Sequence, residues 1–163
     1  RTLLEMSGLQ AVPCTDHIEI GPMIDEIFAD LAPLAEKNNI TLEREGDGAM
    51  TGSDTLIYRL LFNLTENAIK YNRPGGSGRI SGTPEPDKLL IRVSDTGPGI
   101  PERFQRSVFQ PFFRVDKSRS REYGGVGLGL SLVWEIVKLH GGTVCVENSS
   151  EAGTTVAVSL PLR

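Results

Sequence analysis

The sequence predicts a two-layer α/β sandwich in which a mixed sheet packs under about three helices. Two segments, Pro22–Asn38 and Asp54–Asn72, carry apolar residues at helical spacing. A third, Leu128–His140, is interpreted as a helix ended by Gly141–Gly142. Strand-like segments lie between the helices, and hairpins close the chain. This mixture favours a layer of helices on one face of a mixed sheet.

Length and composition fit a single soluble domain. The 163 residues are 39% hydrophobic and 23% charged, an ordinary globular composition. The net charge of −4 argues against a general role with nucleic acid, because Lys and Arg supply most phosphate affinity. No apolar run approaches the length of a membrane span. Cys14 and Cys145 lie far apart without metal-ligand spacing, so we expect reduced thiols, as in the cytosol.

The first half of the chain is expected to begin with short elements. Arg1–Gln10 is interpreted as the end of a helix, followed by a linker and a short strand at His17–Ile20. Pro22 is expected at the first position of the next helix, where proline is favoured. Ile40–Glu45 alternates as a strand.

The second half is expected to contain four strands, which are Arg79–Thr83, Lys88–Ser94, Thr143–Asn148 and Thr154–Leu160. The turn Pro84–Asp87 joins the first two of them. Pro101–Val108 is expected to form a short helix, and Gln110–Gly125 a long, charged loop.

The long second helix, with Ser53 or Asp54 as its cap, carries a polar stripe beside its apolar face. At about 100° per residue, its apolar residues fall within an arc of roughly 140°. Asn63, Asn67 and Lys70 share one stripe that overlaps the edge of this arc. An unpaired buried amide costs about 1–3 kcal/mol, so these groups either bond backbone or water, or face a cleft. In a cleft, amide oxygens suit Mg²⁺ and a lysine suits phosphate.

Two glycine clusters are candidates for ligand contact. Asp95–Ile100 is either a tight turn or a loop whose glycines let the backbone approach a flat ligand. In the second interpretation, the Asp95 carboxylate accepts from an exocyclic amine. Gly125–Leu130 leads into a helix, whose free N–H groups favour an anion, although a flexible hinge has the same composition. Its spacing matches neither a dinucleotide-binding loop nor a Walker A loop.

An aromatic block, Phe109–Arg114, precedes the charged loop. Its phenylalanines either anchor the loop to the core or form the hinge of a movable lid that brings Arg114 to phosphate. His17 and His140 belong to no nucleophile pattern and are interpreted as structural. At a helix C-terminus, the ring of His140 is expected to be partly positive.

The order of these motifs resembles that of the sensor histidine kinases, within the group of ATPases that includes gyrase and Hsp90. Asn63–Tyr71 resembles their N box, Asp95–Ile100 their G1 box, and Phe109–Arg114 their F box. Gly125–Leu130 resembles their G2 box, and Gly153–Thr155 their last glycine–threonine box. The resemblance covers roughly residues 18 to 160.

The resemblance implies a Bergerat-type sandwich that binds ATP and Mg²⁺ under a lid. It implies nucleotide-binding roles for Asn63, Asn67, Lys70, Tyr71, Asp95, Gly97, Gly99, Ile100, Gly125, Gly127, Leu128, Gly129, Leu130 and Thr155. Asp95 would hold the adenine amine, and Thr155 would complete the adenine end. Asn67 would bind Mg²⁺, while Lys70 would meet the phosphates.

The two candidate catalytic residues implied by the resemblance are Glu66 and Arg114. The implied reaction transfers the γ-phosphoryl group of Mg-ATP to a histidine of a dimerisation domain, and onward to an aspartate of a response regulator. Residues 1–12 would be the tail of a dimerisation helix, 13–17 a linker, and 18–163 the catalytic and ATP-binding domain. The phosphoacceptor histidine is missing from this chain. The whole protein would be a homodimeric, membrane-anchored sensor, with this part monomeric alone and cytoplasmic.

Three alternatives stay open. A serine protein kinase of the same ATPase group is disfavoured by the F box and the helix tail. A module that binds ATP or ADP without transferring anything is the second alternative. The third, ATP hydrolysis for conformational work as in gyrase, is disfavoured because no transducer domain follows.

Overall fold

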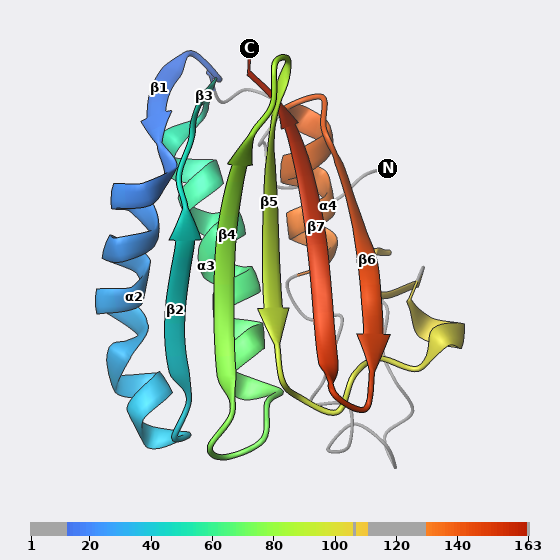
Figure 1. The fold of residues 1–163 in the computed structure, drawn as a ribbon. Helices are drawn as coiled ribbons and strands as arrows, with labels where there is room; N and C mark the ends of the chain where they lie inside the picture. The colour runs from blue at the N-terminus through green and yellow to red at the C-terminus, as the bar shows by residue number, and fades with distance from the viewer. Residues whose placement is uncertain (1–12, 106, 111–129, 163) are drawn as a thin grey trace.

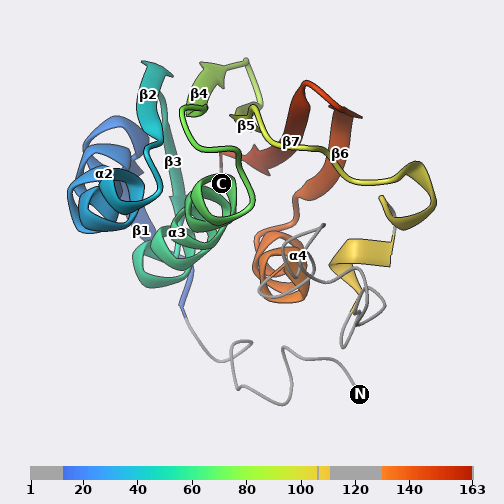
Figure 2. The same ribbon diagram turned by 90° about the horizontal axis from the view of Figure 1, so that it is seen from below.

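The computed structural model of the protein describes residues 13–105, 107–110 and 130–162. Within these residues, three helices cover one face of a five-stranded sheet, which confirms the predicted two-layer sandwich (Figures 1 and 2). The helices are α2 (Ile20–Lys37), α3 (Asp54–Lys70) and α4 (Leu130–Leu139). Seen end-on in Figure 2, α3 lies between α2 and α4 under the sheet.

The sheet has the strand order β2-β4-β5-β7-β6. Its strands are β2 (Thr41–Gly46), β4 (Ser77–Pro84), β5 (Lys88–Asp95), β6 (Thr143–Ser150) and β7 (Gly153–Pro161). β2 and β4 run parallel, since α3 lies in the connection between them, and the other neighbours are antiparallel. The five predicted strands of this sheet are confirmed, with bounds shifted by a few residues.

A separate two-stranded ribbon pairs β1 (Asp16–Glu19) with β3 (Ala49–Gly52). The sequence did not predict β3. Ile20 belongs to α2 rather than to the first strand, and Pro22 is the third residue of that helix instead of its first. Proline is tolerated there because the first N–H groups of a helix have no partner within it.

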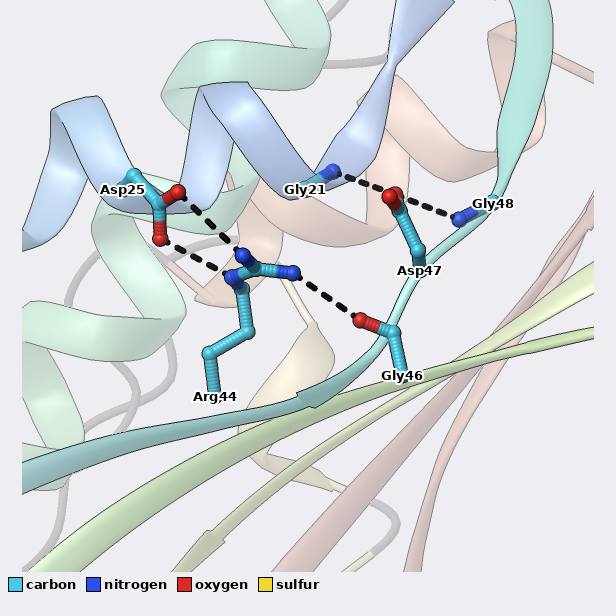
Figure 3. Close-up of polar contacts among 6 residues, drawn as sticks. All are labelled: Gly21, Asp25, Arg44, Gly46, Asp47 and Gly48. Carbon is cyan, nitrogen blue, oxygen red and sulfur yellow. Dashed lines mark hydrogen bonds and ion pairs between the residues drawn. The ribbon is translucent and has the colours of Figure 1, made fainter.

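A corner between β2 and β3 fixes the start of α2 (Figure 3). Asp47 Oδ1 accepts from Gly48 N at 2.7 Å and from Gly21 N, in the first turn of α2, at 2.8 Å. These two bonds hold the pKa of the Asp47 carboxyl below its usual range. Arg44 of β2 donates to both carboxylate oxygens of Asp25 on α2, at 2.9 and 3.3 Å. Two kinds of contact therefore join this edge of the sheet to α2. Asp47 binds the backbone of the helix, and Arg44 forms an ion pair with a side chain of the helix.

His140 joins the start of α3 to the end of α4. Ser53 caps α3 as predicted, because its Oγ accepts from Leu56 N at 3.3 Å. Ser53 N donates to His140 Nε2 at 3.0 Å, while His140 Nδ1 lies 2.8 Å from Ile136 O. Nε2 is therefore the acceptor of the bond from α3, and Nδ1 lies within hydrogen-bond distance of the α4 backbone.

The core lies between the two layers. Its almost fully buried side chains include Ile27, Leu60 and Ile136 from the helices and Ile80, Ile91 and Val158 from the sheet. The predicted helix Pro101–Val108 is instead two short 3₁₀ turns, Glu102–Phe104 and Ser107–Phe109, interrupted near Gln105. The charged loop expected at Gln110–Gly125 lies outside the described residues, apart from its first residue.

Candidate functional site

A pocket opens where the C-terminal half of α3 faces the end of β5 and the start of β7. It is lined by Leu64, Asn67, Ala68, Tyr71, Val93, Asp95, Pro98, Gly99, Ile100, Leu130, Thr154 and Val156. Most of these side chains are apolar, and the polar ones are Asn67, Tyr71, Asp95 and Thr154. An apolar cleft with few, placed polar groups is typical of small-molecule sites.

Asp95, the last residue of β5, supplies the pocket with a largely buried carboxyl group. Its Oδ1 accepts from Gly97 N at 2.9 Å and from Thr154 N at 3.3 Å. Burial raises the pKa of Asp95 to about 6, although these two backbone bonds act in the opposite direction. Neither bond uses Oδ2, which is left to accept from a ligand. Above pH 6 this site therefore presents one anionic acceptor in apolar surroundings.

Three glycines let backbone segments close around Asp95. A Cβ at Gly97 would lie 2.4 Å from the carbonyl oxygen of Tyr71, and one at Gly153 would lie 1.9 Å from that of Asp95. A Cβ at Gly99, whose φ is +86°, would lie 2.2 Å from Ser150 O. The close approach that these glycines permit is thus within the protein. Gly99 also lines the pocket, so its predicted contact with a flat ligand stays a prediction, as does that of Gly97.

The threonine at the pocket is Thr154 rather than the predicted Thr155. Side chains alternate between the two faces of a strand, and buried Thr154 shares the inner face with Val156. Thr155 lies on the other face, where its Oγ1 is 2.9 Å from Ser94 Oγ. The structure therefore corrects this position by one residue.

The polar stripe of α3 reaches the pocket only in part. Asn67 and Tyr71 line it, whereas Asn63, Glu66 and Lys70 do not. Glu66 Oε2 lies 3.7 Å from Lys70 Nζ in a partly exposed ion pair. Burial, and then the charge of Glu66, raise the pKa of Tyr71. The apolar and amide groups of α3 therefore contact the pocket itself, while its charged groups lie beside it.

The lid and G2 predictions fall largely outside the described residues. The residues that the structure does not describe are Arg114, Gly125, Gly127, Leu128 and Gly129, together with Phe112 and Phe113 of the F box. Phe109 is described and buried, as expected of an anchor. Leu130 is also described: it begins α4 and lines the pocket.

Asn67 is the described residue that best fits a magnesium ligand. Across residues 13–105, 107–110 and 130–162, no three His, Cys, Asp or Glu side chains gather into a metal cluster. The half-buried amide of Asn67 nevertheless offers a hard oxygen donor inside the pocket. Mg²⁺ commonly takes one or two protein oxygens and completes its shell with water and substrate phosphates. The residues therefore fit an ion that arrives with a phosphorylated ligand.

Among the residues that the structure describes, no helix is both long enough and apolar enough to span a membrane.

Comparison with known proteins assigns the family. Residues 52–163 match the family described as histidine kinase-, DNA gyrase B- and HSP90-like ATPase. The chain belongs to this ATPase family. The match includes the pocket residues on α3, β5, α4 and β7.

Individual relatives in the family are histidine kinases. The circadian input-output histidine kinase CikA of Synechococcus elongatus is 43% identical over 105 residues, which are 64% of this chain and 14% of CikA. The sensor-like histidine kinase SenX3 of Mycolicibacterium smegmatis is 32% identical over 98% of this chain and 43% of SenX3. The chain thus spans less than half the length of these relatives.

The solved structures agree with the sequence relatives. The catalytic domain of histidine kinase ThkA matches with a TM-score of 0.79 and 28% identity, over 91% of this chain and 95% of that domain. ThkA in complex with the response regulator protein TrrA matches with a TM-score of 0.76 and 27% identity, over 91% of this chain and 42% of that one. The predicted resemblance to the ATPase domain of sensor histidine kinases is confirmed.

Proposed function

We propose that this chain binds Mg-ATP in the pocket between α3, β5 and β7 and transfers its γ-phosphoryl group to a histidine of a dimerisation domain. The observation that carries the proposal is the buried Asp95 carboxyl, whose Oδ1 is bonded to backbone while Oδ2 is left for a ligand. Membership of the ATPase family and the similarity to histidine kinase catalytic domains support the same reaction.

The adenine ring occupies the apolar part of the pocket. Asp95 Oδ2 accepts from the exocyclic amine, a group that guanine lacks at that position. Ile100 and Val93 contact the ring, Thr154 closes its far end, and Tyr71 lies along the base or ribose. A charge-assisted hydrogen bond in such a site is worth about 1.5–3 kcal/mol, enough to dominate base selection.

The triphosphate extends from the adenine towards Asn67 and the segment that precedes α4. Asn67 holds Mg²⁺, which neutralises phosphate charge. Asn63 and Lys70 lie on the same stripe of α3, about one turn before and one turn after Asn67. Gly125, Gly127, Leu128 and Gly129 offer backbone N–H groups before the helix N-terminus at Leu130.

The chain acts mainly by positioning the phosphates and neutralising their charge, as other phosphoryl-transfer enzymes do. An imidazole nitrogen attacks the γ-phosphorus, the bond to the β–γ bridging oxygen breaks, and ADP leaves. We assign Arg114 to the developing charge on the phosphoryl group. Glu66 lies next to Asn67 and is the candidate to accept the imidazole proton.

The partners follow from the same assignment. ThkA has been solved in complex with a response regulator, and we infer that this chain serves a response regulator as well. Its own dimerisation domain supplies the histidine. We infer a homodimeric, membrane-anchored whole protein, with this domain on the cytoplasmic side and monomeric by itself.

Replacement of the adenine acceptor gives the first prediction. Asp95→Asn keeps an oxygen for Gly97 N and Thr154 N but removes the anionic acceptor, so the affinity for ATP should fall about 10- to 100-fold. Isothermal titration of the purified domain with a non-hydrolysable ATP analogue and Mg²⁺ measures it. Asp87→Asn, the same change in the exposed turn at the other end of β5, is the matched control and should bind normally. Equal affinities for both variants would remove the basis of the proposal.

A transfer assay separates the proposed kinase from its alternatives. The domain is mixed with a separately produced, histidine-containing dimerisation domain and ATP labelled at the γ-phosphate. Acid-labile, base-stable label on the dimerisation domain is the expected result. Acid-stable label would indicate a serine kinase, and binding without any label would indicate an ATP-sensing module.

A further inference from the structure

Asn72 is a half-buried amide for which the proposed chemistry has no role. It follows the last residue of α3 by two positions. Its Nδ2 donates to Ala68 O at 3.0 Å and to Ser77 O at 2.8 Å. Its Oδ1 accepts from Arg73 N at 2.7 Å and from Thr96 Oγ1 at 3.0 Å. Both N–H groups and both acceptor positions of the amide are thus occupied, by three different segments of the chain.

Thr96 fastens the loop after β5 to the start of β4. Its backbone N donates to Ser77 O at 3.2 Å, and its Oγ1 accepts from Ser77 N at 2.9 Å. In the regular ladder, Gly78 pairs with Asp95. The Thr96 side chain therefore extends the pairing of β4 and β5 by one step, and Asn72 ties that step to α3.

This junction has no spare room. A Cβ at Gly76 would lie 2.3 Å from Thr96 Oγ1 and 2.5 Å from Asn72 Oδ1. A Cβ at Gly97 would lie 2.4 Å from Tyr71 O. The end of α3 and the loop after β5 are therefore in direct backbone contact.

The junction adjoins both walls of the nucleotide pocket. Tyr71 directly precedes Asn72, and Asp95 directly precedes Thr96, and both preceding residues line the pocket. We propose that Asn72 and Thr96 are positioning residues for nucleotide binding, which set the separation between the side chains of α3 and the Asp95 carboxyl. This inference rests on the proposed binding of ATP in the pocket.

Four variants test it, each titrated with a non-hydrolysable ATP analogue and Mg²⁺. Asn72→Ala removes the amide, and Thr96→Val removes the hydroxyl at nearly constant shape. Each should weaken binding about 10-fold. The double variant should be little worse than either one, because both changes break the same link. Thr96→Ser keeps the hydroxyl and should bind within about 2-fold of the unmodified domain.

Asn38→Ala is the matched control. Asn38 caps the end of α2, and its Nδ2 donates to Leu34 O at 2.8 Å, four residues back, as that of Asn72 does to Ala68 O. It does not line the pocket. Its replacement should lower the melting temperature without changing the affinity for the analogue.

The pH profile of binding separates positioning from a general loss of stability. In the unmodified domain, affinity should fall as Asp95 becomes protonated near pH 6. A loosened loop lets water reach Asp95, and its pKa then moves down towards its usual range. The acid limb of binding should therefore shift to lower pH in Asn72→Ala and Thr96→Val and stay in place in Asn38→Ala.

The outcomes are distinct. If Asn72→Ala and Thr96→Val bind normally, with the acid limb unmoved, both residues are merely structural and the inference is wrong. Loss of affinity in Asp95→Asn would in that case leave the proposed function standing. If Asp95→Asn also binds normally, the assignment of the pocket fails, and this inference fails with it.

Discussion

At the scale of single residues, the site depends on one carboxyl group that the fold partly desolvates. The two backbone bonds to Asp95 Oδ1 offset only part of the cost of burying its charge, and the pKa remains raised to about 6. A residue that only stabilised the fold would gain nothing from this arrangement. The raised pKa at a pocket wall is instead typical of a functional group.

The pH dependence of binding is the second prediction. Adenine needs the ionised carboxylate, so affinity for an ATP analogue should be constant between pH 7 and 8 and fall about 10-fold by pH 5, one unit below the pKa of Asp95. Isothermal titration across this range checks it. An affinity that stays flat down to pH 5 would show that no group with a pKa near 6 contacts the base.

The stability of Asp95→Asn is the third prediction. The pKa of Asp95 in the folded state is raised above its usual range, so the folded state binds this proton more tightly than the unfolded state does. The stability that protonation contributes is present below pH 4 and is lost as the pH rises through about 6. The neutral variant should therefore melt at or above the temperature of the unmodified domain at pH 7.5, and this advantage should shrink towards pH 4. A lower melting temperature at pH 7.5 would contradict it.

At the scale of elements, regular patterns were predicted and pairing between distant segments was not. The period of α3 and its Ser53 cap were readable because both depend on nearby residues. β3 was missed because Ala49–Gly52 is short and is held by pairing with β1, a distant segment of the chain. His17, for example, pairs with Thr51, which lies 34 residues later in the sequence (51 − 17). Thr154 could have been chosen over Thr155, since it falls in phase with Val156, Val158 and Leu160.

The connection between α3 and α4 gives the fourth prediction. His140→Ala leaves Ser53 N without its acceptor, which should lower the free energy of unfolding by about 1–3 kcal/mol. Urea denaturation measures it. His17→Ala is the control, because the His17 ring is exposed and lies beside the Glu19 carboxylate on the same strand, so its loss should cost less than about 0.5 kcal/mol. Equal effects of the two changes would mean that His140 does not hold the helices together.

At the scale of the whole molecule, the polar groups of the site come from three separate parts of the chain. α3 and its C-cap contribute Asn67 and Tyr71, the end of β5 contributes Asp95, and β7 contributes Thr154. The sequence named most of these residues because the family motifs occur in order. The positioning role of Asn72 and Thr96 could not be predicted. Both residue types are common in turns, and their bonds join segments that are distant in the sequence.

The central claim is that the adenine of ATP binds against Asp95. The most direct measurement is a crystal structure of the domain with Mg²⁺ and a non-hydrolysable ATP analogue. We expect the adenine amine within about 3.2 Å of Asp95 Oδ2 and the phosphates beyond Asn67. A nucleotide bound elsewhere, or one whose base makes no contact with Asp95, would contradict the account.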